Sequence, residues 1–348
     1  MKQYKSIDLA KFVCAILIII LHTSPFASYS RVLTIGFRNI ITPIAVPFFF
    51  VASGFIAFKK IDGKSGKEQT QYVMKHLRRI LTMYLIWSAI YFIFVVIKWT
   101  RVDDFSVWNI LEYIRDFFFE GSYSTIWFLP ALLVATLLVW LLRKKLSYKN
   151  IFIIACAVYV FTLGGSSYYG LACKIPVVRD IYNVYYSFFD SIKNGVCFGL
   201  IFVCMGAMLA EKETVVVQRG TMGKTIVLCI IFALLLAVEE VALGVLNWNV
   251  KGVDTVVMLV PFSWFFFAFL LKWEIKGQDK LFLTLRKYSL LLFLCQRIPL
   301  SIIDMFMSGT VIATNSLLYF ATVLGTTMLI AFLIIHASNK VKWLKYLY

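Results

Sequence analysis

Residues 7–26 read IDLAKFVCAILIIILHTSPF, and this stretch decides the class of protein. Residues 12–21 carry no charge, which is typical of a helix that crosses hydrocarbon, where an ionisable side chain is costly and usually has a function. Asp8, Lys11 and His22 interrupt that pattern. At 100° per residue the three side chains fall on one narrow stripe, and the helical rise places His22 roughly 16 Å above Lys11.

Two interpretations of this stripe stay open. In the first, Asp8 and Lys11 reach into the cytoplasmic headgroups while His22 reaches the outer ones. In the second, His22 is a buried acid or base, because imidazole is the side chain whose ordinary pKa lies near physiological pH.

The composition is that of a polytopic membrane protein. Of 348 residues, 61% are hydrophobic and only 15% are charged, far from the average of soluble proteins. Runs such as LTMYLIWSAIYFIFVVI (81–97) are apolar on all sides and long enough to cross about 30 Å of hydrocarbon, whereas a barrel strand would alternate apolar and polar residues. The predicted fold class is therefore an all-α integral membrane protein.

Ten transmembrane helices are predicted, in one polytopic domain over residues 1–348. The loops on alternate sides hold most of the 35 Lys and Arg residues, so the positive-inside rule places both termini in the cytoplasm. The formal net charge of +17 indicates topology and affinity for anionic membrane lipids, and its scatter between spans argues against nucleic-acid binding. The predicted spans are residues 7–24, 40–58, 80–98, 125–142, 151–164, 191–210, 224–243, 253–271, 285–306 and 311–335.

Cysteine and histidine usage gives neither a disulfide framework nor a metal site. The seven Cys residues form no C-x-x-C pair, and the three His residues accompany no H-E-x-x-H motif. The longest predicted outer loop, near residues 99–124, is too short to form a second domain. We therefore expect no metal site and no separate soluble domain in this chain.

Four segments resemble the acyltransferase 3 family of membrane proteins: IDLAKFVCAILIIILH, VPFFFVASGF (46–55), KHLRRILTMY (75–84) and TIWFLPALL (125–133). The first helix of that family carries a basic residue, ten intervening positions and a histidine, which Lys11 and His22 match. The resemblance implies a ten-helix fold in which cytoplasmic acyl-CoA modifies an acceptor on the outer side, with His22 as the catalytic base.

Two further segments, LGGSSYYGL (163–171) and DSIKNGVCFGLIFVCMG (190–206), resemble the membrane domain of vancomycin-resistance serine racemases. That likeness implies a multi-pass protein of the bacterial cytoplasmic membrane that binds or moves L-serine for cell-wall precursor synthesis. It also implies a partner, the fused cytoplasmic racemase domain, which depends on pyridoxal phosphate. About a dozen residues follow the last predicted span, so we expect no racemase activity and no cofactor in this chain.

The cytoplasmic Arg-x-x-Arg of the acyltransferase 3 family aligns here with His76 and Arg79. Lys75, Arg78 and Arg79 still offer three cations, expected beside a helix N-terminus, an arrangement suited to nucleotide phosphates. The alternative is an ordinary positive-inside anchor. The departure from Arg-x-x-Arg weakens the expectation that acyl-CoA is the donor.

Arg297 and Asp304 lie seven residues apart in CQRIPLSIID (295–304), hence on one face of the predicted ninth helix. Because an unpaired guanidinium near mid-span is hard to bury, Arg297 is expected to face the bundle interior. It either pairs with Asp304 to stabilise the helix or binds a carboxylate, such as that of serine.

The remaining substrate-site candidates are polar side chains at or near predicted helix ends. Ser166, Ser167 and Tyr168 belong to an irregular GGSSYYG segment that can line a cavity, although tyrosines there also suit the interfacial belt. Ser53 stands beside Gly54, where a close contact between helices is the alternative. The set is completed by Trp127, Asp190 and Asn194.

Three functions therefore compete, of which the third, an anchor that tethers a soluble domain, is disfavoured because an anchor needs one or two spans and not ten. The chain is a serine-handling membrane domain in which Arg297, Asp190 and the GGSSYYG segment contact the ligand, or it is an acyltransferase with His22 as base. A basic tunnel of coenzyme A size at the cytoplasmic mouth would favour the enzyme, and a closed gate would favour the carrier. We favour the serine-racemase-like membrane domain.

Overall fold

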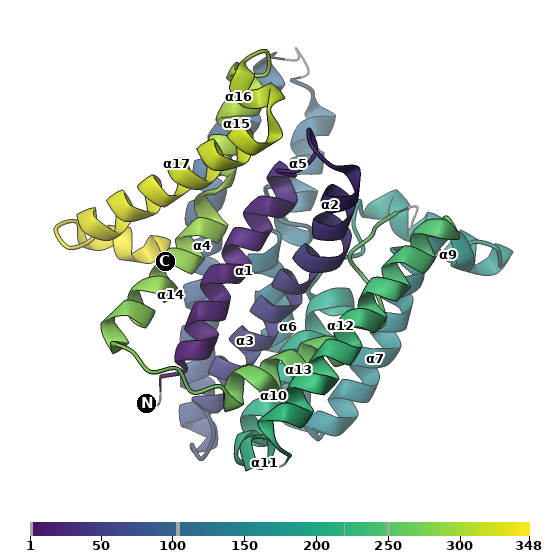
Figure 1. Ribbon diagram of the computed structural model, residues 1–348, viewed down its shortest axis with the longest axis vertical. Helices are drawn as coiled ribbons and strands as arrows, with labels where there is room; N and C mark the ends of the chain where they lie inside the picture. The colour runs from purple at the N-terminus through teal and green to yellow at the C-terminus, as the bar shows by residue number, and fades with distance from the viewer. Residues whose placement is uncertain (1–2, 102–104, 219, 249–250) are drawn as a thin grey trace. The chain divides into compact units, whose positions relative to one another are not determined.

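The computed structural model describes residues 3–101, 105–218, 220–248 and 251–348, and the regular structure within these ranges is helical throughout (Figure 1). Among the described residues, seven helical segments are long and apolar enough to span a membrane: Lys5–Thr23, Arg31–Lys59, Gly66–Arg101, Tyr148–Gly165, Met222–Val245, Asp279–Phe306 and Ser316–Ala337. Three shorter apolar segments are Phe128–Arg143, Gly195–Glu211 and Leu259–Lys272. All of these segments overlap predicted spans, and the prediction of an all-α membrane protein is confirmed.

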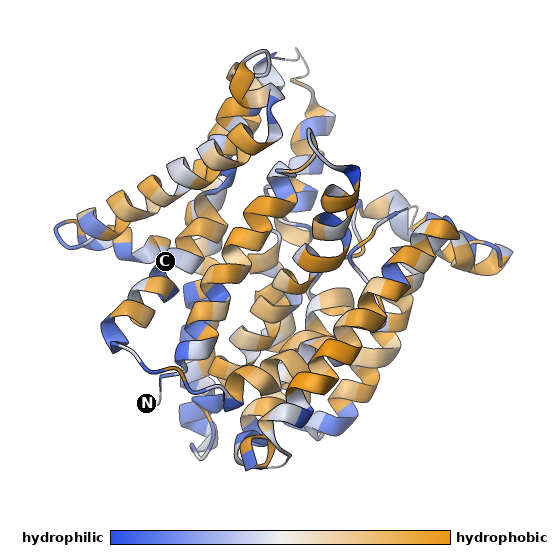
Figure 2. Cartoon of the chain, viewed as in Figure 1, coloured by the Kyte–Doolittle hydropathy of each residue, from blue (hydrophilic) through white to orange (hydrophobic). Residues whose placement is uncertain are grey.

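Hydropathy follows the helices as the sequence predicts. Figure 2 shows hydrophobic residues along most of α12 (Met222–Val245) and α17 (Ser316–Ala337), while hydrophilic residues gather at helix ends and in connections. This distribution suits segments whose middle lies in hydrocarbon and whose ends lie in the headgroup region.

The chain divides into two compact units. Unit 1 consists of Met1–Ala45, Arg79–Leu129 and Lys276–Tyr348, and unit 2 consists of Val46–Arg78 and Pro130–Ile275. The long helix α4 (Gly66–Arg101) contributes its first part to unit 2 and its second part to unit 1.

Unit 1 is built around α1 (Lys5–Thr23), which packs against α14 (Asp279–Cys295) and α17. The stripe of α1 that contains Asp8, Ala15 and Ile18 is buried. The other elements of unit 1 are α2 (Arg31–Ile35), η1 (Gly36–Ile41), η2 (Thr42–Ile44), α5 (Val107–Phe119), α15 (Arg297–Phe306), α16 (Val311–Thr314) and η4 (Lys342–Leu347).

Asp8 joins α1 to α14. Its carboxylate is 1% exposed and accepts two hydrogen bonds from Arg286, Nε to Oδ1 at 2.7 Å and Nη2 to Oδ2 at 2.8 Å. This bidentate geometry is the strongest that a guanidinium and a carboxylate form. The interpretation that Asp8 reaches into the headgroups is therefore wrong, because a partner on another helix keeps the carboxylate buried.

Unit 2 is packed around α10 (Leu200–Glu211), most of whose residues are buried. Gly54 of α3 (Ala45–Lys59) leaves room for the backbone of Val203, since an added Cβ would lie 2.5 Å from the Val203 carbonyl oxygen. Half-buried Ser53 stands beside this contact, so the close helix packing weighed for the Ser53–Gly54 pair is present. The other elements are α6 (Phe128–Arg143), α7 (Tyr148–Gly165), α8 (Tyr169–Ala172), α9 (Pro176–Phe188), η3 (Gly195–Gly199), α11 (Glu213–Gln218), α12 and α13 (Leu259–Lys272).

Three segments differ from the sequence prediction. The outer loop predicted near residues 99–124 contains the amphipathic helix α5, and α9 precedes the predicted sixth span. Helix α4 begins at Gly66, well before the predicted third span, because Ser65 and Glu68 form a capping box there: Ser65 N–H donates to Glu68 at 3.1 Å, and Glu68 N–H donates to Ser65 Oγ at 3.4 Å.

Candidate functional site

A break in a long apolar segment positions the candidate site in unit 1. Helix α14 ends one residue before Gln296, and α15 begins one residue after it. Pro299 has no N–H, so the Cys295 carbonyl loses the helical donor that it would otherwise have. At the same turn Gln296 Nε2 donates to another carbonyl, that of Phe293, at 3.0 Å. Gln296 keeps helical backbone angles, φ −55° and ψ −28°, so the break is a single weakened turn in a segment that is helical from Asp279 to Phe306.

Beside this break lies a pocket of about 640 Å³ whose walls belong to unit 1. Its walls come from the end of α4, one face of α5, residues 122–124 and α15. The charged residues among its lining are Lys98, Glu112, Asp116, Arg297 and Asp304. The pocket therefore presents both cations and carboxylates to whatever occupies it.

Arg297 is held at one edge of its guanidinium. Its Nε donates to Ser124 Oγ at 2.9 Å, and its Nη2 donates to the same oxygen. A guanidinium has five N–H donors in a planar fork, so three remain for a ligand that offers two oxygens. Among the described residues the predicted pairing with Asp304 is not formed, because Asp304 accepts from Tyr319 at 2.7 Å instead.

The residues around Ser124 are fixed by side-chain hydrogen bonds. The ring of Tyr123 stacks on Tyr91 with centroids 4.8 Å apart, and the Tyr123 and Ser301 hydroxyls are hydrogen-bonded at 2.7 Å. Ser122 donates its N–H to Tyr84 Oη at 3.0 Å. These contacts place Ser124, and through it Arg297, in a defined position.

Gly121 lets this segment turn against the start of α6. Its φ of +100° is one that L side chains rarely adopt, and an added Cβ would collide with the Trp127 backbone. Half-buried Trp127, which the sequence placed in the substrate site, does not line the pocket within the described part of the chain. Its observed contact is with the turn that carries Ser124.

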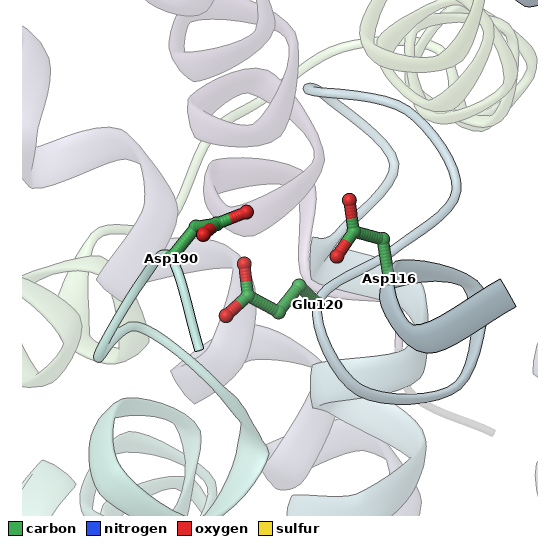
Figure 3. A group of neighbouring side chains, drawn as sticks. All are labelled: Asp116, Glu120 and Asp190. Atoms are coloured by element: carbon green, nitrogen blue, oxygen red, sulfur yellow. The ribbon is translucent and has the colours of Figure 1, made fainter. Parts of the chain in front are cut away.

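The carboxylates of the pocket come mainly from α5. Glu112 and Asp116 are four residues apart, so they lie on the same face of that helix, and Asp116 also accepts from Arg115 at 2.7 and 2.9 Å. Figure 3 shows Asp116 at the end of α5 with Glu120 one turn further on, and it also draws Asp190, which belongs to unit 2. Burial raises the pKa of Tyr113, on the same helix.

The residues predicted from α1 are in unit 1 but do not line this pocket. Lys11 and His22 are both half-buried, and His22 lies in the last turn of α1. Neither residue is among the described residues that form the pocket wall. The role of His22 as a base stays a prediction.

Two predicted site residues of unit 2, Ser167 and Tyr168, help to fix the connection that leads into α13. Ser167 Oγ accepts from the Thr255 N–H at 3.2 Å, and Tyr168 donates to Glu239. Glu239 in turn accepts from the N–H groups that precede α13 at 2.7 and 2.8 Å. Ser166 is likewise buried. The irregular GGSSYYG segment therefore has a structural task in unit 2 that the belt interpretation did not anticipate.

The other predicted residues of unit 2 are spread over its surface and helix starts. Asn194 Oδ1 accepts from the N–H groups of Val196 and Cys197 at 2.9 Å each, so it caps the helical segment that begins with η3. Asp190 is exposed in the connection before it. Sequence reasoning had placed both in the wall of the substrate site.

The three cations predicted to hold nucleotide phosphates lie inside α4. Lys75, Arg78 and Arg79 are exposed, but the helix begins nine residues before Lys75, at Gly66. The expectation that a helix N-terminus lies beside them is wrong, because the capping box starts the helix further upstream. They are therefore without the helix-end dipole that was expected to help bind phosphate.

Sequence reasoning missed most of the pocket wall. Lys98, Glu112, Asp116 and Ser124 lie in or next to residues 99–124, which the sequence prediction left as a loop. The available signal was the four-residue spacing of Glu112 and Asp116 within NILEYIRD (109–116), which is typical of one face of a helix.

Comparison with known proteins supports a membrane-domain assignment. The family model described as an acyltransferase domain, that of acyltransferase 3, matches residues 4–336. The chain is 28% identical to an amino-acid racemase of Enterococcus faecalis over 283 residues, which are 80% of this chain and 37% of that protein. A second amino-acid racemase of the same organism is 27% identical over 337 residues, 97% of this chain and 46% of that protein.

A serine/alanine racemase of Enterococcus gallinarum is 24% identical over 271 residues, 78% of this chain and 37% of that protein. The chain thus spans less than half the length of each of these three relatives. No solved structure matches the chain.

Proposed function

We infer a function for this chain, which belongs to the acyltransferase 3 family of membrane proteins and is similar to proteins named as amino-acid and serine/alanine racemases. Its unit 1 pocket binds L-serine or a similar small amino acid. The protein moves this ligand across the membrane. The observation that carries the proposal is the fork of Arg297, which Ser124 holds at one edge only. Such a fork is suited to a carboxylate.

The charges of the pocket match a zwitterion. Arg297 and Lys98 attract the ligand carboxylate, and Glu112, Asp116 and Asp304 attract its ammonium group. A volume of about 640 Å³ is in the range of small-molecule sites and leaves room for bridging water around a ligand as small as serine. Hydroxyls of Tyr123 and Ser301, already bonded to each other, are placed to accept or donate to the serine side chain.

Uptake by the reconstituted protein tests the proposal. Proteoliposomes that contain the purified chain are expected to accumulate labelled L-serine faster than empty liposomes, and unlabelled L-serine should compete with the label. Glycerol of the same concentration, which lacks both charges, should not compete. Uptake equal to that of empty liposomes, together with no binding of L-serine to the detergent-solubilised protein, would refute the carrier.

The predicted topology leads to a separate test. With both termini in the cytoplasm, single cysteines placed at Gly63, Asn150 and Lys340 are expected to resist an impermeant maleimide in intact cells, because the positive-inside rule puts these basic loops inside. A cysteine at Ser106 should react, whereas Ser167, which is also predicted to lie outside, is buried, and Asn249, the third position predicted outside, is not among the described residues. Labelling of Lys340→Cys in intact cells would remove the model with an even number of spans.

Acyl transfer is the second function, favoured by the family match over residues 4–336. In that alternative His22, in the last turn of α1, is the base that activates the acceptor, and acyl-CoA is the donor. The predicted cytoplasmic cations Lys75, Arg78 and Arg79 would then hold the nucleotide phosphates from exposed positions on α4.

Replacing His22 by alanine is expected to abolish acyl transfer while leaving a folded, monodisperse protein, because general-base catalysis contributes about 10²- to 10⁴-fold in rate. The measurement is the release of free coenzyme A from acetyl-CoA by wild type and variant. His336→Ala, in the last turn of α17, is the matched control and should retain the wild-type rate. Equal rates in wild type and His22→Ala would remove His22 as the base.

A further inference from the structure

A second pocket, of about 380 Å³, lies within unit 2. Its walls come from the end of α3, residues 61–63, the first turn of α4, the end of α6, the start of α7 and the end of α10. By the predicted topology these helix ends face the cytoplasm. None of the functional residues named above accounts for this pocket.

Two neighbouring cations in its wall are each backed by an aromatic ring. The guanidinium carbon of Arg143 lies 4.7 Å from the ring centroid of Tyr148, and Lys144 Nζ lies 3.9 Å from that of Trp140. All four residues line the pocket. Stacking of this kind holds a cation in place while leaving N–H groups at its edge for an anion.

Two helices also begin at this pocket. Gly66, Gln69 and Thr70 in the first turn of α4 and Tyr148 at the start of α7 belong to its wall. Both starts are capped by a serine, which accepts from the Glu68 N–H in α4 and from the Asn150 N–H in α7, so the starts offer an anion mainly the positive end of the helix dipole. Helix starts therefore add to the attraction that Arg143 exerts on an anion.

The acidic residues of the pocket wall form only weak ion pairs. Glu211 lies 3.4 Å from Arg143 Nη2, with both side chains 45% exposed, and Asp62 lies 3.6 Å from Lys59, with the Asp62 side chain 60% exposed. Exposed pairs of this kind contribute at most about 1 kcal/mol. A phosphate that forms two parallel bonds to a guanidinium is a stronger partner than such a carboxylate.

The sequence around the pocket is strongly basic. Residues 59–67 read KKIDGKSGK and residues 143–149 read RKKLSYK, so the two segments together hold eight cations and one acid. Among the described residues the wall itself holds two cations, Arg143 and Lys144, and two carboxylates, Asp62 and Glu211, so the surplus of positive charge comes from the flanking segments, which concentrate anions near the pocket. Basic pockets between transmembrane helices on the cytoplasmic side are a known setting for anionic headgroups.

We propose that this pocket binds a phosphate group, with Arg143 as its bidentate anchor and Lys144 as the second cation. A phospholipid headgroup and a free nucleotide both carry the group. The proposal does not depend on serine binding in unit 1.

The purified full chain provides the test. Native mass spectrometry measures how much phosphatidylglycerol stays bound as detergent is increased, and calorimetry measures binding of ADP in detergent. Arg143→Gln is expected to weaken retention of the phosphate ligand about tenfold, because a charge-assisted bidentate contact is lost. Lys149→Gln makes the same change in charge on an exposed residue of α7 outside the pocket wall and should have little effect.

A third variant tests whether misfolding explains the weaker binding of Arg143→Gln. Glu211→Gln removes the carboxylate that competes for Arg143 and should tighten binding, a gain that a damaged fold cannot produce. Retention of phosphatidylglycerol without ADP binding identifies the lipid as the source of phosphate, and ADP binding with the same variant pattern identifies a free nucleotide. Equal losses in Arg143→Gln and Lys149→Gln, or no binding of either probe by wild type, would overturn the proposal.

Discussion

Replacing Arg297 by lysine is expected to weaken L-serine binding by about 1–3 kcal/mol, roughly 5- to 150-fold in Kd. Lysine keeps the positive charge but cannot form two parallel hydrogen bonds to a carboxylate. It also loses the two bonds from the guanidinium to Ser124, which position the group in wild type. Calorimetric titration of L-serine into both proteins measures the difference.

Asp304→Asn separates ligand binding from helix stability. Asp304 accepts from Tyr319, and within the described residues Arg297 donates to Ser124 and not to Asp304, so an amide oxygen can replace the carboxylate as acceptor. We expect a small change in serine affinity, limited to the weaker attraction for the ammonium group. Unchanged affinity in Arg297→Lys, or no serine binding by wild type, would leave the acyltransferase as the better proposal.

The second large effect is expected at the contact between α1 and α14. Arg286→Met should lower the free energy of unfolding by about 3–5 kcal/mol, because it leaves the Asp8 carboxylate buried without a cation. Asp8 is 1% exposed, whereas Arg286 is 44% exposed, so removing the arginine should cost more than Asp8→Asn. Unfolding in detergent, followed by the loss of helical circular dichroism, measures the change.

Lys5→Met is the matched control for this contact. It breaks an ion pair in the same unit with the same 2.7 Å distance, but its partner Asp279 is 71% exposed. An exposed pair should contribute at most about 1 kcal/mol. Equal losses of stability in Lys5→Met and Arg286→Met would show that burial of Asp8 does not set the strength of its pair.

The sequence was most informative where hydrophobicity alone decides the structure. The apolar segments could be located because each one needs about 20 residues to cross the membrane. The start of α4 was misjudged because Ser65 and Glu68 cap it within a charged loop that hydropathy assigns to solvent. Helix α5 was missed because it is short and amphipathic, and hydropathy does not distinguish such a helix from a loop.

The partners of the charged residues could not be predicted from helical spacing. Asp8 finds Arg286, 278 positions away in the chain, and Arg297 finds Ser124 rather than Asp304. Spacing gives the neighbours on the same helix, whereas these side chains are satisfied by other segments. Arg297 stood out in the sequence because a guanidinium in an apolar segment is hard to bury without a partner, and its role as a ligand site stays a prediction.

The helical segment Asp279–Phe306 is weakened at Gln296, between α14 and α15. Two backbone hydrogen bonds of Gln296 are long: its N–H donates to the Leu292 carbonyl at 3.3 Å, and its carbonyl accepts from the Leu300 N–H at 3.4 Å. Bending the helix at this point therefore costs less free energy than bending it at a turn with shorter hydrogen bonds. Arg297 and Ser301 both belong to α15. A ligand that bridges Arg297 and the carboxylates of α5 would therefore draw α15 toward α5. If the proposed zwitterion binds, occupancy of the pocket and bending at Gln296 would form one linked equilibrium, and we expect a ligand that lacks either charge to bind without closing the pocket.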